Sequence, residues 1–198
     1  MNVDQLIGRL KSDPAFMENV TAWTSLPASE GRYADFPASL DERISKVLHA
    51  RGIHRLYTHQ AESFAAAEQG RDFVVVTPTA SGKTMCYNLP VLSAILRNPD
   101  ARAMYLFPTK ALSADQASEL YELVEAMNVD VKAYTYDGDT QGAARKAIRQ
   151  AGHIVVTNPD MLHANILPNH TKWVKLFENL KYIVIDEIHT YRGVFGSN

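Results

Sequence analysis

The fold of this chain is decided by residues 74–90, VVVTPTASGKTMCYNLP. A run of β-branched residues there enters a short loop that ends in Gly-Lys-Thr, and an apolar stretch with the character of a helix follows. The loop fits the phosphate-loop pattern G-x-x-x-x-G-K-S/T, except that Thr77 stands at the first glycine position. A loop between a strand and a helix directs backbone N–H groups towards bound phosphate oxygens. The segment therefore predicts a nucleotide-binding loop.

Different residues of this loop suit different parts of a nucleotide. Lys83 can reach the outer phosphates as a point charge, and Thr84 offers a hydroxyl to Mg²⁺. Gly82 must be small because the backbone passes close to the phosphate. The alternative, a tight turn with an exposed lysine, is disfavoured by the strand before the loop and the helix after it. The predicted nucleotide-binding residues of the loop are Thr79, Ala80, Ser81, Gly82, Lys83 and Thr84.

A second motif, YIVIDEIH, occupies residues 182–189. An apolar strand that ends in two acids would place Asp186 and Glu187 at one edge of a sheet. One carboxylate can hold Mg²⁺, usually through water, and the other can orient or deprotonate an attacking water. Taken alone, the motif fits a charged strand end that faces solvent equally well. Together with the upstream loop it favours catalysis, because ATP hydrolysis needs both parts.

Apolar, β-rich runs alternate with helical stretches from Leu56 onwards. This alternation predicts an α/β fold with a parallel sheet, in which ligands bind at the carboxyl ends of the strands. The expected strands are residues 72–78, 101–108, 131–136, 152–158 and 180–187. The expected helices are residues 82–98, 110–127, 140–150 and 159–168. Polar clusters fall at the predicted strand ends, at residues 77–84, 107–110, 136–140, 157–160 and 185–189.

The first part of the chain has a different pattern. Residues 3–16 and 40–53 are typical of short amphipathic helices, with a Pro-, Gly- and Ser-containing loop between them. We therefore expect a helical appendage over residues 1–55 and the main domain over residues 56–198. The last predicted strand needs partners beyond the end of this sequence, so we expect an N-terminal piece of a longer protein.

Composition restricts the class of protein. The chain has 198 residues, a net charge of −2 and a single cysteine, which excludes an internal disulfide and fits a reducing compartment. No segment predicts a signal peptide or a membrane span. We therefore expect a soluble cytoplasmic protein with no membrane partner. The charge favours neither the presence nor the absence of a nucleic-acid partner.

Six motifs in one order resemble those of superfamily 2 helicases, the DEAD/DEAH-box relatives. LYTHQ resembles the Q motif, TPTASGKT motif I, FPTKALSADQ motif Ia, YDGDT the GG-type motif, TNPDML motif Ib and DEIH motif II. Together they cover nearly all of residues 56–198. The detailed sequences of these motifs, together with TYRGVFGS at residues 190–197, are similar to those of the MrfA-like and Hrq-type branch of this family. That branch has RecQ-like relatives.

The resemblance implies a first RecA-like helicase lobe, with ATP and Mg²⁺ as ligands. Tyr57 and Gln60 would recognise adenine, since an amide side chain can pair with both a donor and an acceptor on the base. Without the family, Gln60 is a polar residue at the start of a helix. The resemblance further implies these roles: phosphate and metal binding by Lys83 and Thr84, metal binding by Asp186, base catalysis by Glu187, and coupling to a second lobe by His189.

The resemblance also implies contacts to the backbone of single-stranded DNA. Loop hydroxyls, N–H groups and helix starts bind phosphate without reading sequence, so the domain need not be basic. Ordinary helix caps and an Asp-Gly turn explain the same residues. The implied contacts are Pro108, Thr109, Lys110, Gln116, Gly138, Asp139, Thr140, Thr157, Asn158, Pro159 and Asp160.

The function implied by the family is an ATP-dependent DNA helicase that moves 3′ to 5′ and acts in DNA repair. The motifs of the second lobe are missing, so we expect the 198-residue chain alone to bind ATP weakly, to hydrolyse it poorly and not to unwind DNA. Two alternatives belong to other classes. One is a nucleotide-dependent scaffold that binds DNA without mechanical work, and the other is a motor that moves on duplex DNA without separating the strands.

Overall fold

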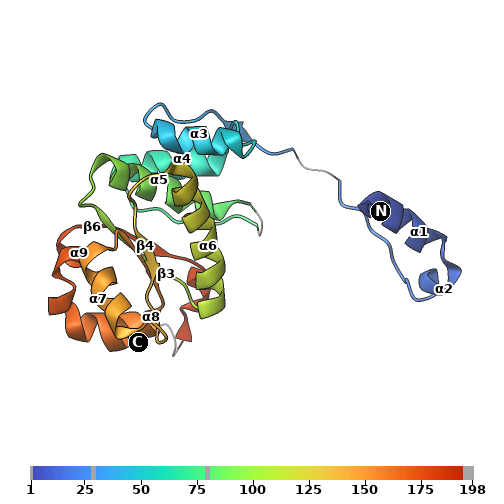
Figure 1. The fold of residues 1–198 in the computed structure, drawn as a ribbon. Helices are drawn as coiled ribbons and strands as arrows, with labels where there is room; N and C mark the ends of the chain where they lie inside the picture. Colours follow the sequence, from blue (N-terminus) through green and yellow to red (C-terminus); the bar gives the residue numbers. More distant parts are fainter. Residues whose placement is uncertain (1, 28–29, 79–80, 194–198) are drawn as a thin grey trace. The chain divides into compact units, whose positions relative to one another are not determined.

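The computed structural model divides the chain into two compact units, Met1–Gly31 and Arg32–Asn198 (Figure 1). The smaller unit contains helices α1 (Val3–Ser12) and α2 (Pro14–Met17), and neither helix has a buried side chain. A capping box between Asn2 and Gln5 begins α1, which satisfies N–H groups that lack a partner inside the helix. The residues that the structure describes are 2–27, 30–78 and 81–193.

Among the described residues of the larger unit, four parallel strands form the main sheet, in the order β4-β5-β3-β6. The predicted α/β fold is therefore confirmed. These strands are β3 (Arg102–Leu106), β4 (Ala133–Thr135), β5 (Ile154–Thr157) and β6 (Leu180–Ile185). Leu106 of β3 is in register with the last residue of both β5 and β6, Thr157 and Ile185. The carboxyl ends therefore meet at one edge, where the predicted polar clusters follow.

Helices cover both faces of this sheet, with α6 on one side and α7 and α9 on the other (Figure 1). Alternate residues of β3 enter different cores: Ala103 and Tyr105 pack with one group of helices, and Met104 and Leu106 pack with the other. The helices are α3 (Glu42–Ala50), α4 (Thr58–Glu68), α5 (Lys83–Arg97), α6 (Lys110–Met127), α7 (Gly142–Ala151), α8 (Pro159–Met161) and α9 (Val174–Glu178).

Residues 32–55 are part of the larger unit. Ile44, Val47 and Leu48 of α3 are buried in the core that contains α5 and α6. A two-stranded antiparallel sheet, β1 (Tyr33–Ala34) with β2 (Leu56–Tyr57), joins this region to the start of α4. The domain boundary expected after residue 55 stays a prediction, which a truncation can test.

Two predicted elements differ in the structure. Residues 72–78 form no strand, and Val74 and Val76 are 70% and 90% exposed. Valine favours a strand only where its side chain packs against neighbours, and these two do not pack. Residues 159–168 are not one α-helix: α8 is followed by a π-turn at Leu162–Ile166 and a 3₁₀ segment at Leu167–Lys172. Pro168 lacks the N–H that an α-helix would use there.

None of the helices in the described part of the chain is long and apolar enough to cross a membrane.

Candidate nucleotide and nucleic-acid site

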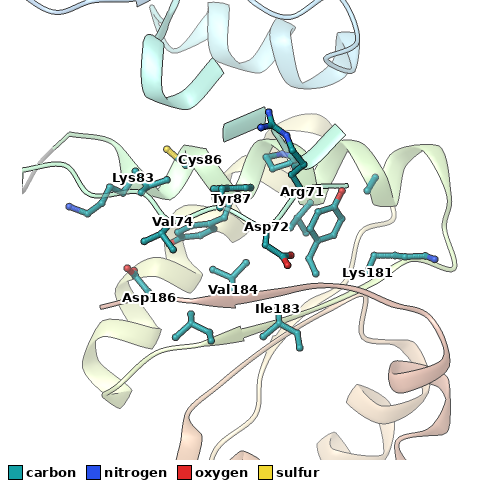
Figure 2. Close-up of a pocket in the computed structure, with 18 of the residues that line it drawn as sticks. Arg71, Asp72, Val74, Lys83, Cys86, Tyr87, Lys181, Ile183, Val184 and Asp186 are labelled. Carbon is teal, nitrogen blue, oxygen red and sulfur yellow. The ribbon is translucent and has the colours of Figure 1, made fainter. Parts of the chain in front are cut away.

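A cavity of about 1090 Å³ lies beside β6 and extends to its carboxyl end (Figure 2). Lys83 and Tyr87 line it from α5, and Asp186, Glu187 and His189 line it from the segment that follows β6. Figure 2 shows Lys83 and Asp186 at one end of the cavity, with Arg71 and Lys181 at the other. The fold therefore brings residues of the two predicted motifs, about 100 positions apart in the sequence, to one site.

Gly82 has a backbone conformation that other residues adopt poorly. Its φ is +71°, in the left-handed region, and a Cβ there would lie 2.6 Å from Nε2 of Gln60. The Gln60 side chain is buried and donates from Nε2 to the Gly82 carbonyl oxygen at 2.9 Å. Its Oε1 accepts the N–H of Tyr57, also at 2.9 Å. Gln60 thus fastens α4 to the phosphate loop, and adenine recognition by Tyr57 and Gln60 stays a prediction.

Lys83 binds its own loop in this structure. Its Nζ donates to the carbonyl oxygens of Thr77 at 3.0 Å and Pro78 at 3.2 Å. The hydroxyls of Thr77 and Ser81 share a hydrogen bond of 2.6 Å, so the residue at the missing glycine position links the two ends of the loop. Of the predicted loop residues, Thr79 and Ala80 lie outside the described part of the chain.

Asp186 and Glu187 leave β6 in a sharp turn. The Oδ1 atom of Asp186 accepts the N–H of Glu187 at 2.9 Å, and Glu187 has a left-handed φ of 50°. Burial raises the pKa of Asp186, the negative charge of Glu187 adds to this effect, and Lys83 opposes it. Nδ1 of His189 lies 3.2 Å from Oε2 of Glu187. The two acids therefore sit in different surroundings, as different chemical roles would require.

Oxygen ligands for a divalent cation are present at this site. A carboxylate from Asp186 and a hydroxyl from Thr84 are the donor types that Mg²⁺ prefers, with phosphate oxygens and water as its other ligands. Among the described residues, no three His, Cys, Asp or Glu side chains come together as a metal cage. The donor chemistry thus fits Mg²⁺ that binds together with a nucleotide.

Gln116 has contacts that the sequence did not indicate. Its Oε1 accepts hydrogen bonds from the Thr84 hydroxyl at 2.7 Å and the Tyr87 hydroxyl at 3.1 Å. The family resemblance implies a contact to DNA for Gln116. In the structure its acceptor atom faces α5, 32 residues away in sequence, and no local pattern signals a contact of that range.

The first two predicted DNA segments are joined by an ion pair. Nζ of Lys110, the first residue of α6, lies 2.7 Å from Oδ2 of Asp139. Asp137 shapes the turn that carries Asp139 by accepting the N–H groups of Asp139 and Thr140 at 2.9 and 3.1 Å. The side chain of Thr109 accepts the N–H of Leu112 at 3.3 Å and so caps α6. Pro108 immediately precedes this cap, and Gly138 lies within the turn.

In the third predicted DNA segment, residues 157–160, most of the observed contacts stabilise the fold. Thr157 is 2% exposed, and its hydroxyl donates to the carbonyl oxygen of Tyr136 at 2.7 Å. Asn158 caps α8 by accepting the N–H of Met161 at 2.8 Å, and Pro159 is the first residue of that helix. Asp160 is exposed in the same turn. DNA contacts by these residues stay predictions, since each observed contact has a structural reason.

Comparison with known proteins places the chain in a group of helicases. A family model described as DEAD/DEAH box helicase matches residues 57–198. The chain is 57% identical over 197 residues to the uncharacterized ATP-dependent helicase YprA of Bacillus subtilis (strain 168), covering 100% of this chain and 26% of that protein. It is 34% identical over 200 residues to the ATP-dependent helicase hrq1 of Schizosaccharomyces pombe, covering 98% of this chain and 19% of that protein.

A solved structure agrees with these sequence relatives. The crystal structure of the DUF1998 helicase MrfA bound to DNA and AMPPNP matches with a TM-score of 0.89 and 57% identity, over 100% of this chain and 27% of that chain. The chain thus spans about a quarter or less of the length of these three proteins.

Proposed function

Because this chain belongs to the DEAD/DEAH box helicase family, we propose that it is the ATP-binding lobe of an ATP-dependent DNA helicase. The observation that carries the proposal is that Lys83, Asp186 and Glu187 line the same cavity. Phosphoryl transfer depends on positioning and on charge stabilisation, and these three side chains are of the types it needs. The whole chain is similar to MrfA, a helicase crystallised with DNA and AMPPNP, and this similarity supports ATP and DNA as the ligands of this chain.

In the proposed mechanism Lys83 exchanges the carbonyl oxygens of Thr77 and Pro78 for phosphate oxygens. Thr84 and Asp186 would hold Mg²⁺, which when bound neutralises charge on the phosphates. Glu187 would accept the proton of the attacking water, with its carboxylate oriented by His189. His189, 73% exposed at its side chain, would also report the nucleotide state to a second lobe.

The DNA part of the proposal concerns the loops after β3, β4 and β5. Their N–H groups, hydroxyls and Lys110 would contact the backbone of one DNA strand without reading its sequence. Closure of two lobes around ATP would move the strand. We propose 3′-to-5′ movement, a role in DNA repair and a cytoplasmic location; these details rest on the resemblance to MrfA-like helicases and, for location, on the single cysteine.

The proposal is tested first by nucleotide binding. Lys83→Ala in this chain should lower the affinity for a fluorescent ATP analogue at least tenfold, because a charge-assisted contact to phosphate is lost. Without the second lobe, the chain itself should show little DNA-stimulated ATP hydrolysis. Equal binding by the wild type and Lys83→Ala would contradict the proposal.

Strand displacement by the longer protein tests the helicase reaction itself. A 3′ single-stranded tail should support unwinding and a 5′ tail should not, and Lys83→Ala should abolish it. ATP hydrolysis stimulated by duplex DNA but not by single strands would indicate a duplex motor instead. ATP binding without either activity would indicate a scaffold.

A further inference from the structure

Gln116 of α6 connects to the first turn of α5 through one atom. Its Oε1 accepts both the Thr84 hydroxyl, at 2.7 Å, and the Tyr87 hydroxyl, at 3.1 Å. An amide oxygen has two lone pairs, so these two donors saturate it. Gln116 is half-buried, which shields both hydrogen bonds from competition with water.

The two donors are themselves held in place. Thr84 and Tyr87 are three residues apart on α5 and therefore share a face of the helix. The Tyr87 ring packs edge-on against Tyr105 of β3, with ring centroids 5.3 Å apart. The acceptor atom of Gln116 is thus fixed relative to both α5 and the sheet.

We propose that Gln116 is a positioning residue for the Thr84 hydroxyl in the nucleotide site, and is not a contact to the DNA backbone. The inference rests on the proposed function, because that function makes the Thr84 hydroxyl a ligand of Mg²⁺. A threonine hydroxyl has one proton and two lone pairs. With the proton committed to Gln116, both lone pairs are free for a cation.

The contact also fixes the direction of the Thr84 hydroxyl. Thr84 is the second residue of α5, and its hydrogen bond to Gln116 holds the hydroxyl towards α6. Second-shell acceptors of this kind commonly orient the ligands of a metal site.

The position of Gln116 disfavours a DNA contact. It lies six residues after Lys110, about 9 Å along the helix axis from the end that carries the predicted phosphate contacts. The two hydroxyls of α5 that bind its Oε1 also fix the direction of the whole amide group. The structural role therefore explains why an amide stands at this point of α6.

The test compares Gln116→Leu with the wild-type chain in binding a fluorescent ATP analogue, with Mg²⁺ and with EDTA. Gln116→Leu should lower the Mg²⁺-dependent affinity about tenfold and leave the affinity in EDTA unchanged. Gln116→Glu, which keeps an acceptor for both hydroxyls, should retain at least the wild-type Mg²⁺-dependent affinity. Gln150→Leu, the same change at an exposed position of α7, should have no effect.

A double mutant tests the dependence on Thr84. In a Thr84→Val background, Gln116→Leu should cause no further loss of Mg²⁺-dependent affinity, because the hydroxyl to be positioned is gone. Independent losses that add together would overturn the proposal. So would loss of single-stranded DNA binding by Gln116→Leu with unchanged Mg²⁺ dependence, although the proposed function would survive.

Two further outcomes distinguish failure of the Gln116 proposal from failure of the proposed function. If the wild-type chain binds no nucleotide under any condition, the proposed function and the role of Gln116 are both contradicted. If Gln116→Leu does not fold, Gln116→Glu decides, since a folded Gln116→Glu protein with weakened Mg²⁺-dependent binding contradicts the proposal.

Discussion

At the scale of single residues, Gly82 is required by backbone geometry and by the close approach of the Gln60 side chain. Gly82→Ala should destabilise the fold by about 1–2 kcal/mol, because alanine is strained in the left-handed region. It should also weaken nucleotide binding, because the new methyl group displaces the buried Gln60 amide. Urea unfolding and analogue binding measure the two effects.

Gly142→Ala in α7 is the matched control for this prediction. A Cβ at Gly142 meets nothing within 4 Å, and alanine favours a helix. This variant should be as stable as the wild type or more so. Equal stability of Gly82→Ala and Gly142→Ala would show that the loop backbone is not constrained in this way.

The ionised Asp186 carboxylate lowers the stability of the fold, although the proposed Mg²⁺ site needs it. Its raised folded-state pKa means that the ionised carboxylate opposes folding at neutral pH, and that this penalty disappears as the pH falls towards the ordinary value of 3.8. Asp186→Asn should therefore raise Tm at pH 7 by a few degrees at most, and abolish Mg²⁺-dependent nucleotide binding. The gain in Tm should shrink as the pH is lowered.

Asp115→Asn supplies the comparison, since Asp115 is exposed on α6 and its neutralisation should leave Tm unchanged. A lower Tm for Asp186→Asn than for the wild type at pH 7 would contradict the assigned sign.

At the scale of elements, the ion pair between Lys110 and Asp139 ties the start of α6 to the turn after β4. If Lys110 binds DNA phosphate, that phosphate must replace the Asp139 carboxylate. Asp139→Asn should then raise the affinity for single-stranded DNA about two- to fivefold, the range expected for one exposed ion pair. Fluorescence anisotropy with a labelled oligonucleotide measures this change.

Asp130→Asn is a close control for Asp139→Asn. The two side chains are both 85% exposed and each is paired with a lysine, but Asp130 precedes β4 at the opposite end of the sheet. Its substitution should leave DNA affinity unchanged. Adding Lys110→Ala to Asp139→Asn should remove the gain, and a gain that persists would exclude Lys110 as its cause.

At the scale of the whole molecule, the structure predicts where the chain can be shortened. The helices of the unit Met1–Gly31 bury no side chain, so a chain starting at Arg32 should unfold with nearly the Tm of the full chain. Starting at Leu56 removes Leu40, Ile44, Val47 and Leu48 from the core. Their burial is worth about 6–12 kcal/mol, comparable to the whole stability of a domain, so that shorter chain should not fold cooperatively. Thermal unfolding of a folded chain 56–198 would instead support the boundary predicted from sequence.

The sequence by itself determined the α/β fold, the helices over residues 83–97 and 110–127 and the two motifs at Lys83 and Asp186, because periodicity and loop chemistry are local properties. It did not determine whether residues 72–78 pair as a strand, since that depends on a neighbour and not on valine content. Only the tertiary structure brought the motifs to one cavity and set Gln116 against Thr84. The contact between Thr84 and Gln116, 32 positions apart, follows from the packing of helices on a sheet, and no local pattern encodes it.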